Sequence, residues 1–129
     1  MEKVLNFRDL GLSETTLEAI GKKGYETPSP IQALCIPRLL DGTKDVIGQA
    51  QTGTGKTAAF SLPIIDRIER ENYVQAIILA PTRELVIQVA EEISSLKGDK
   101  RLRVLPIYGG SNIQDRKSTR LNSSHSTTS

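Results

Sequence analysis

Apolar residues follow helical spacing in some segments of the chain and form short uninterrupted runs in others. One helix is predicted after Ser13, in ETTLEAIGKKG, where the apolar positions lie three residues apart. A second helix is predicted from Pro30 through IQALCIPRLL, closed by Asp41 and Gly42. Pro37 falls inside this second pattern, so a kink or break is expected there.

The rest of the pattern alternates short apolar runs with longer helical segments. The runs DVIGQA, AIILA and RLRVLPIYGG are typical of strands, and AIILA is apolar on both faces, as in a buried parallel sheet. Between them, KTAAFSLPIIDRIER and RELVIQVAEEISSLK have helical periodicity. The order strand, helix, strand, helix, strand predicts parallel strands joined by right-handed crossovers, hence an α/β fold with a parallel sheet.

Composition narrows the class of protein. With 129 residues, of which 37% are hydrophobic, the chain has the size of one small domain. No segment approaches the roughly 18 consecutive apolar residues of a membrane span, and the start, MEKVLNF, lacks the order of a signal peptide. The single cysteine, Cys35, has no partner for a disulfide and no second ligand for a metal, which fits a buried residue in a reducing compartment. We therefore expect a soluble, cytoplasmic protein.

The excess positive charge lies entirely in the last residues. Of the 17 basic and 15 acidic residues, three basic and one acidic lie in residues 115–129, so residues 1–114 hold 14 of each. The tail, DRKSTRLNSSHSTTS, has one large apolar residue and is predicted to be disordered, either as a basic arm or as a solvated end. Residues 115–125 also resemble the forward translation of a widely used sequencing-library adapter. We therefore interpret the tail as an assembly artefact and expect the natural sequence to be interrupted at about Gln114.

A phosphate-binding loop is predicted between the first strand and the helix that follows it. The stretch AQTGTGKT matches the phosphate-loop pattern with alanine in place of the first glycine. The glycines allow close approach of the backbone to a phosphate, the lysine adds a charge for the β- and γ-phosphates, and the last hydroxyl can ligate Mg²⁺. A turn with a solvated lysine is the alternative, which the spacing and the flanking elements disfavour. The predicted nucleotide-binding residues are Ala50, Gln51, Thr52, Gly53, Thr54, Gly55, Lys56 and Thr57, with Lys56 and Thr57 as catalytic residues and Thr57 as the metal ligand.

Upstream of this loop, GYETPSPIQ at residues 24–32 resembles the Q motif of the DEAD-box RNA helicases, and Phe7 precedes it at the family's spacing for an isolated aromatic residue. The family usually has Phe where Tyr25 stands and Thr where Ser29 stands. A glutamine amide can pair with both N7 and the N6 amine of adenine, and an aromatic face can stack on the base. The resemblance implies that Gln32 reads the adenine edge, Phe7 stacks on the base, Tyr25 lines the base pocket and Ser29 bonds to the phosphate loop. Taken alone, Gln32 would be an exposed helical residue and Phe7 a core residue.

Two later elements resemble RNA-binding motifs of the same family. PTREL follows AIILA directly and resembles motif Ia, and the glycine pair after the third predicted strand matches the family's GG element. A strand end that leads into a helix offers backbone N–H groups and a hydroxyl to a phosphate, and glycines let an RNA backbone come close. An ordinary helix cap and an ordinary turn are the alternatives. The RNA-binding residues that the resemblance implies are Pro81, Thr82, Arg83, Glu84, Gly109 and Gly110.

The resemblance covers nearly all of residues 4–114, and the wording AQTGTGKTAAF is most similar to bacterial members. It implies that residues 1–114 are a truncated N-terminal RecA-like helicase domain, with the Q motif at about residues 5–33. The implied activity is ATP-dependent unwinding of short RNA duplexes with ATP and Mg²⁺, through contacts to the RNA backbone. Little sequence specificity for RNA and none for DNA is expected.

The chain lacks other elements that the family needs for hydrolysis. Its Asp-Glu-Ala-Asp and Ser-Ala-Thr motifs and its second RecA-like domain do not occur in the sequence, so the chain itself is expected to bind nucleotide without hydrolysing it. A kinase or another phosphate-loop NTPase is the alternative enzyme, but it leaves the Q motif unexplained. A partial sheet of three strands would also leave a hydrophobic edge uncovered.

Overall fold

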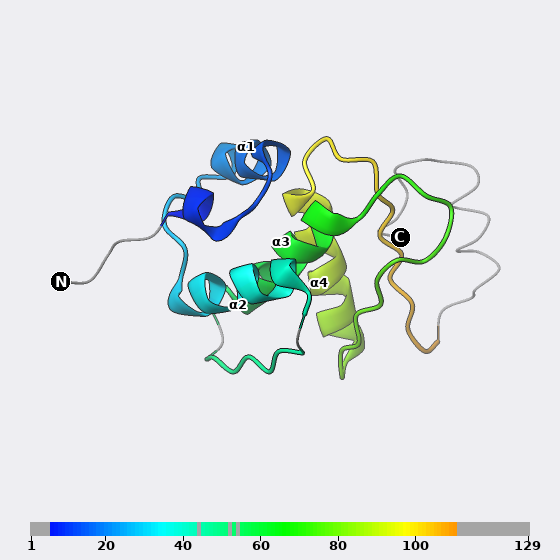
Figure 1. Ribbon diagram of the computed structural model, residues 1–129. Helices are drawn as coiled ribbons and strands as arrows, with labels where there is room; N and C mark the ends of the chain where they lie inside the picture. The colour runs from blue at the N-terminus through cyan, green and yellow to red at the C-terminus, as the bar shows by residue number, and fades with distance from the viewer. Residues whose placement is uncertain (1–5, 44, 52, 54, 111–129) are drawn as a thin grey trace.

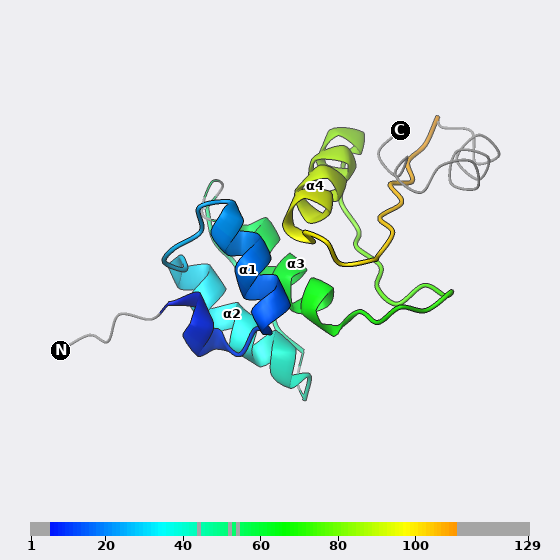
Figure 2. The same cartoon turned by 90° about the horizontal axis from the view of Figure 1, so that it is seen from above.

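The structure is a computed structural model that describes residues 6–43, 45–51, 53 and 55–110. Within these residues the order of elements is η1 (Phe7–Leu10), α1 (Glu14–Lys22), α2 (Pro30–Asp41), α3 (Lys56–Arg67) and α4 (Arg83–Leu96). Helix α3 lies in the middle, with α2 on one side and α4 on the other, and α1 contacts both α3 and α4 (Figures 1 and 2). The predicted tail, residues 115–129, lies outside the described residues.

The predicted helices are confirmed, and their ends follow the expected capping. Ser13 and Ser29 occupy the N-cap positions of α1 and α2, and Gly42 ends α2 in the left-handed conformation with φ of 71°. Of the kink or break predicted at Pro37, the break does not occur, because α2 continues through this residue. A proline inside a helix removes one hydrogen bond, but the adjacent Ile36 is 0% exposed and its packing in the core compensates.

The core lies where the helices meet α3. Leu62 of α3, Ile36 of α2 and Leu96 of α4 are all 0% exposed, and Ile20 of α1 is 1% exposed. Burial of one such side chain stabilises a fold by about 1.5–3 kcal/mol. Contacts across α3 therefore hold the N-terminal helices and α4 together.

The three predicted strands do not occur in the described residues, so the parallel sheet is not confirmed. Segments 45–50, 76–80 and 101–108 are assigned as neither helix nor strand. The side chains of Ile47 and Leu79 are 99% and 92% exposed. A strand requires a neighbouring strand for its ladder of backbone hydrogen bonds, and no residue that the structure describes is assigned to a strand.

Burial in two of these segments alternates from residue to residue. In 101–108 the even-numbered positions are buried or half-buried and the odd-numbered positions are exposed, and in 77–80 Ile78 and Ala80 are half-buried while their neighbours are exposed. Ile78, Leu102 and Val104 pack against the core. A period of two is the side-chain pattern of a strand with one face against a helical layer.

None of the described helices has the length and apolarity that a membrane span requires.

Candidate functional site

The predicted phosphate loop leads directly into the first turn of α3. Gly55 is the N-cap residue in the left-handed conformation, with φ of 84°, and its carbonyl accepts the first helical hydrogen bond from the Ala59 N–H at 3.1 Å. Lys56 and Thr57 are the first two helical residues, and the first turn contains no acidic side chain. The unpaired N–H groups and the positive end of the helix dipole therefore favour an anion at this end of α3.

Part of the predicted loop lies outside the described residues. Thr52 and Thr54 are in this group, while Ala50, Gln51 and Gly53 are described. Gly53 also has a positive φ, of 80°. At the other end of the loop, Thr57 lines an open cavity of about 370 Å³, whose other lining residues are Lys23, Leu85, Gln88, Val89, Glu91, Glu92 and Ser95.

Gln32 joins the Q motif to this loop. Its side chain is 5% exposed and makes two hydrogen bonds: Nε2 donates to the Gly55 carbonyl at 3.2 Å, and Oε1 accepts from the Ser29 N–H at 2.9 Å. The Gln32 N–H in turn donates to Ser29 Oγ at 3.4 Å, which completes a capping box at the start of α2. Gln32 thus has a hydrogen bond to the phosphate loop, and Ser29 Oγ lies close to the same loop, 3.3 Å from a Cβ atom built on Gly55. The predicted bond between Ser29 and the loop stays a prediction, because Thr52 and Thr54 lie outside the described residues. Gln32 is also buried, not the exposed residue that the isolated pattern suggests.

The fit between Gln32 and the loop depends on the glycine at position 55. A Cβ atom added to Gly55 would lie 2.3 Å from Gln32 Nε2, well inside contact distance. A carboxamide has two acceptor lone pairs and two donor hydrogens, and the two bonds described use one of each. Within the described contacts, one donor hydrogen and one acceptor lone pair of the Gln32 side chain have no assigned partner.

Phe7 and Tyr25 lie together as an aromatic pair. Their ring centroids are 5.9 Å apart with an interplanar angle of 53°, a tilted arrangement, and Phe7 is 4% exposed within the core. The Tyr25 hydroxyl donates to Glu92 Oε1 of α4 at 3.2 Å. Burial, and then the charge and hydrogen bond of Glu92, raise the pKa of Tyr25 above its ordinary value. The burial of Phe7 favours a core role in this structure, because stacking on a base requires an accessible ring face.

The two predicted RNA-binding elements are close together. Thr82 is the N-cap of α4, and its Oγ1 accepts from the Leu85 N–H at 3.1 Å. Arg83 Nη2 donates to the Gly109 carbonyl at 3.0 Å, across 26 residues of sequence. Pro81, Glu84 and Gly110 are exposed beside this contact in sequence. The structure thus brings the PTREL and GG segments to one place on the surface.

Sequence reasoning missed Tyr108, which completes this contact. The guanidinium carbon of Arg83 lies 5.4 Å from the centroid of the Tyr108 ring, a cation–π arrangement. The available signal was an aromatic residue directly before the glycine pair. It was not used because a single tyrosine at the end of an apolar segment is usually explained by packing.

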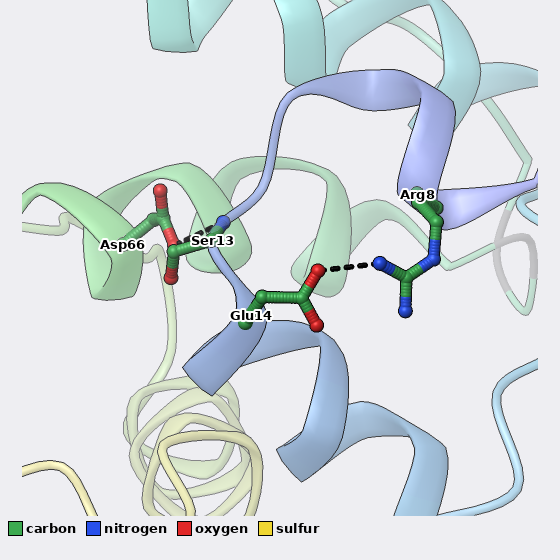
Figure 3. Close-up of polar contacts among 4 residues, drawn as sticks. All are labelled: Arg8, Ser13, Glu14 and Asp66. Carbon is green, nitrogen blue, oxygen red and sulfur yellow. Dashed lines mark hydrogen bonds and ion pairs between the residues drawn. The ribbon is translucent and has the colours of Figure 1, made fainter.

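Sequence reasoning also missed Asp66, which anchors the N-terminal helices to α3 (Figure 3). One carboxylate oxygen accepts hydrogen bonds from the Ser13 N–H (3.1 Å), Ser13 Oγ (2.6 Å) and Thr16 Oγ1 (2.6 Å) at the start of α1. Beside it, Arg8 and Glu14 form an exposed ion pair. Burial acts to raise the pKa of Asp66, but the hydrogen bonds from Ser13 and Thr16 outweigh it and lower the pKa below its ordinary value. Ser13 and Asp66 lie 53 residues apart in the sequence, so no local sequence pattern could predict their contact.

The described residues contain no group of three or more His, Cys, Asp or Glu side chains that could hold a metal ion.

Comparison with known proteins identifies the family. A sequence model of the DEAD/DEAH box helicase family matches residues 29–128. The chain is 56% identical over 108 residues to a DEAD-box ATP-dependent RNA helicase CshA of Bacillus cereus, with 83% of this chain and 20% of the relative covered. It is 57% identical over 111 residues to an ATP-dependent RNA helicase CshA of Limosilactobacillus reuteri, with 85% of this chain and 22% of the relative covered. The chain thus spans about a fifth of the length of these relatives.

Solved structures of a DEAD box protein and of an RNA helicase match this chain as well. A DEAD box protein from the hyperthermophile Methanococcus jannaschii superposes with a TM-score of 0.84 at 47% identity, covering 92% of this chain and 32% of that one. The RNA helicase Prp28 from Chaetomium thermophilum, bound to ADP, superposes with a TM-score of 0.77 at 37% identity, covering 91% of this chain and 30% of that one. The matched sequence and the matched fold together place this chain in the DEAD/DEAH box helicase family.

Proposed function

We propose that this chain is the ATP-binding and RNA-contacting part of an ATP-dependent RNA helicase. The observation that carries the proposal is the hydrogen bond from Gln32 to the Gly55 carbonyl, because it joins a predicted adenine-reading residue to a predicted phosphate loop. The names of the relatives support it. Since the chain spans about a fifth of their length, we assign unwinding to the whole protein and nucleotide binding to this chain.

The triphosphate is proposed to bind at the N-terminal end of α3. The backbone N–H groups of the loop and of the first turn would hold the phosphates, and Lys56 would contact the β- and γ-phosphates. The Thr57 hydroxyl would supply one ligand to Mg²⁺, with phosphate oxygens and waters supplying the others, as is usual for this ion. When bound, Mg²⁺ would neutralise phosphate charge. The residues Ala50 to Gly55 complete the proposed cradle.

The adenine base is proposed to lie against the Q motif. The remaining donor and acceptor of Gln32 match N7 and the N6 amine of adenine, and guanine presents an acceptor at the equivalent of N6. Tyr25 would line the base pocket, Phe7 would support Tyr25 from the core, and Ser29 would hold Gln32 in place through the capping box.

RNA is proposed to bind where the PTREL and GG segments meet. Pro81, Thr82, Arg83 and Glu84 lie at the start of α4, and Gly109 and Gly110 lie within reach of Arg83. Contacts of this kind address sugar and phosphate, so low sequence specificity follows. We also propose a cytoplasmic location, which the free, buried Cys35 fits.

The finer fold is proposed to be the parallel-sheet, RecA-like fold predicted from the sequence, with residues 1–114 forming part of the N-terminal RecA-like domain. The period-two burial in 77–80 and 101–108 supports strands with one face on the helices. The apolar residues on the opposite side of the same segments, such as Leu79 and Ile107, support a second face that further elements cover.

Hydrolysis by this chain alone is proposed to be negligible. Residues 1–114 contain no Asp-Glu pair of any kind, and the family's acidic motif holds Mg²⁺ and positions the attacking water.

Nucleotide titration of the 129-residue chain tests this function. We expect ATP to bind more tightly than GTP, and Gln32→Ala to weaken ATP binding by about ten-fold or more, which corresponds to a lost bidentate contact. Binding of inorganic tripolyphosphate reports the phosphate loop alone and should change less. Gln49→Ala, an exposed glutamine close to the loop, is the matched control and should bind like the unchanged chain. Equal binding of ATP and GTP would contradict the proposal.

A further inference from the structure

Arg83 lies in an unfavourable place for a positive charge. It is the first residue of α4, where the helix dipole is positive, so a cation there gains nothing from the helix itself. An exposed arginine in this position could turn away from the helix into solvent. Its guanidinium instead lies against the segment Tyr108–Gly110, which indicates that contacts with this segment determine its position.

The guanidinium makes two interactions with that segment and leaves little space for a side chain at its third residue, Gly110. Nη2 donates to the Gly109 carbonyl at 3.0 Å, and the guanidinium carbon lies 5.4 Å from the Tyr108 ring centroid. A Cβ atom added to Gly110 would lie 3.1 Å from the same Nη2, closer than most side chains tolerate, and Gly110 has φ of 84°. Planar stacking and a directed N–H together suit arginine and not lysine, whose ammonium is a compact point charge.

We propose that Arg83 is a positioning residue that holds the Gly109–Gly110 turn beside the first turn of α4. Arg83 then contributes to RNA binding mainly by placing this turn, which itself contacts the RNA. The inference rests on the proposed RNA-binding function and assigns Arg83 a role other than that of a phosphate counter-charge. Its consequence is that two segments 26 residues apart present their backbone together to one stretch of RNA.

The first arm of the experiment needs no RNA. Amide NMR spectra of the 129-residue chain are compared for the unchanged sequence, Arg83→Lys and Arg103→Lys. Arg103 is an exposed arginine in the same segment as the turn and serves as the matched control. We expect Arg83→Lys to shift the Gly109 and Gly110 amide resonances and to speed their hydrogen exchange, and Arg103→Lys to leave them in place. Unchanged Gly109 and Gly110 amides in Arg83→Lys overturn the proposal.

The second arm measures binding of a single-stranded RNA oligonucleotide over a range of salt concentrations. A positioning role predicts that Arg83→Lys loses nearly as much affinity as Arg83→Ala, roughly ten-fold for a lost charge-assisted hydrogen bond, although lysine keeps the charge. A phosphate counter-charge predicts that Arg83→Lys binds like the unchanged chain. It also predicts that Arg83→Ala lowers the slope of log affinity against log salt by about 0.7, the value for one phosphate of a single strand.

The two arms separate the two ideas. Altered glycine amides together with equal losses in both Arg83 variants support the positioning role. Full RNA affinity in Arg83→Lys overturns it. Altered amides in a chain that binds no RNA support the structural role of Arg83 and refute the proposed RNA-binding function instead.

Discussion

At the scale of single residues, the absence of a Cβ atom at Gly55 permits both the left-handed backbone of the phosphate loop and the contact of this loop with Gln32 of the Q motif. Gly55 and Gly24 have nearly equal φ values, 84° and 85°, but a Cβ on Gly24 would meet nothing within 4 Å. Both Gly→Ala changes should therefore cost about 1–2 kcal/mol for the left-handed conformation. Gly55→Ala should cost about 1–2 kcal/mol more, because the new Cβ displaces the Gln32 amide from its hydrogen bonds.

Urea unfolding of the two variants measures this difference. Gly24→Ala is the control for backbone strain, and nucleotide titration of the same samples should show weaker ATP binding only for Gly55→Ala. Equal free energies of unfolding for the two variants would mean that Gln32 moves aside without loss.

The contacts of individual residues were predictable only where they are local. The start of α1 after Ser13 and the end of α2 at Gly42 follow from local signals. The partner of Arg83 and the anchor provided by Asp66 depend on how the chain returns to itself, which no spacing in the sequence records. For the same reason the sequence could not decide whether Phe7 is a core residue or stacks on a base, and the structure shows it buried.

At the scale of elements, Asp66 is the side chain that docks α1 on α3. It serves as a capping carboxylate supplied from another helix, with three hydrogen bonds to the start of α1. Asp66→Ala should therefore lower the free energy of unfolding by about 0.5–2 kcal/mol, the usual range for loss of a capping side chain. Asp99→Ala, which removes an exposed carboxylate, should have little effect and is the control.

The same contact makes a pH-dependent contribution with a definite sign. The pKa of Asp66 is lowered in the fold below its ordinary value of 3.8, so its ionised form is the one that the fold stabilises. This contribution is fully present above pH 3.8 and is lost as the pH falls below that value through the folded pKa. Unfolding curves at a series of pH values should show the difference between the unchanged chain and Asp66→Asn narrowing on acidification. A constant difference through the acid range would contradict this account.

The helices were predictable as elements because their signals are local. Apolar spacing and capping residues located the four α-helices of the described residues. At Pro37 the helix does not break, since packing of the neighbouring Ile36 offsets the lost hydrogen bond. The strands were not confirmed because a strand depends on partners elsewhere in the chain. The period-two burial of 101–108 is the part of the strand prediction that the local pattern did determine.

At the scale of the whole molecule, the helices cover one side of the extended segments, and the other side is apolar and exposed. Ile77, Leu79 and Ile107 are 78%, 92% and 59% exposed. Relatives at over 50% identity are about four times as long as this chain, so a protein of their length has further chain to cover the proposed sheet. An exposed apolar segment of high β-propensity is also a site for self-association.

Two adjacent residues distinguish the two sides. Ile78 packs against the core, and Leu79 points away from it. In this chain, Ile78→Lys should lower the free energy of unfolding by about 2–5 kcal/mol, because it removes a packed side chain and brings a charge against the core. Leu79→Lys should change it by less than about 0.5 kcal/mol and should reduce self-association in sedimentation velocity, since it places a charge on the exposed segment.

In the whole protein both variants should be destabilising, because the proposed sheet is covered on both faces. Equal damage from both variants in this chain would refute the alternation, and tolerance of Leu79→Lys in the whole protein would refute the covered parallel sheet.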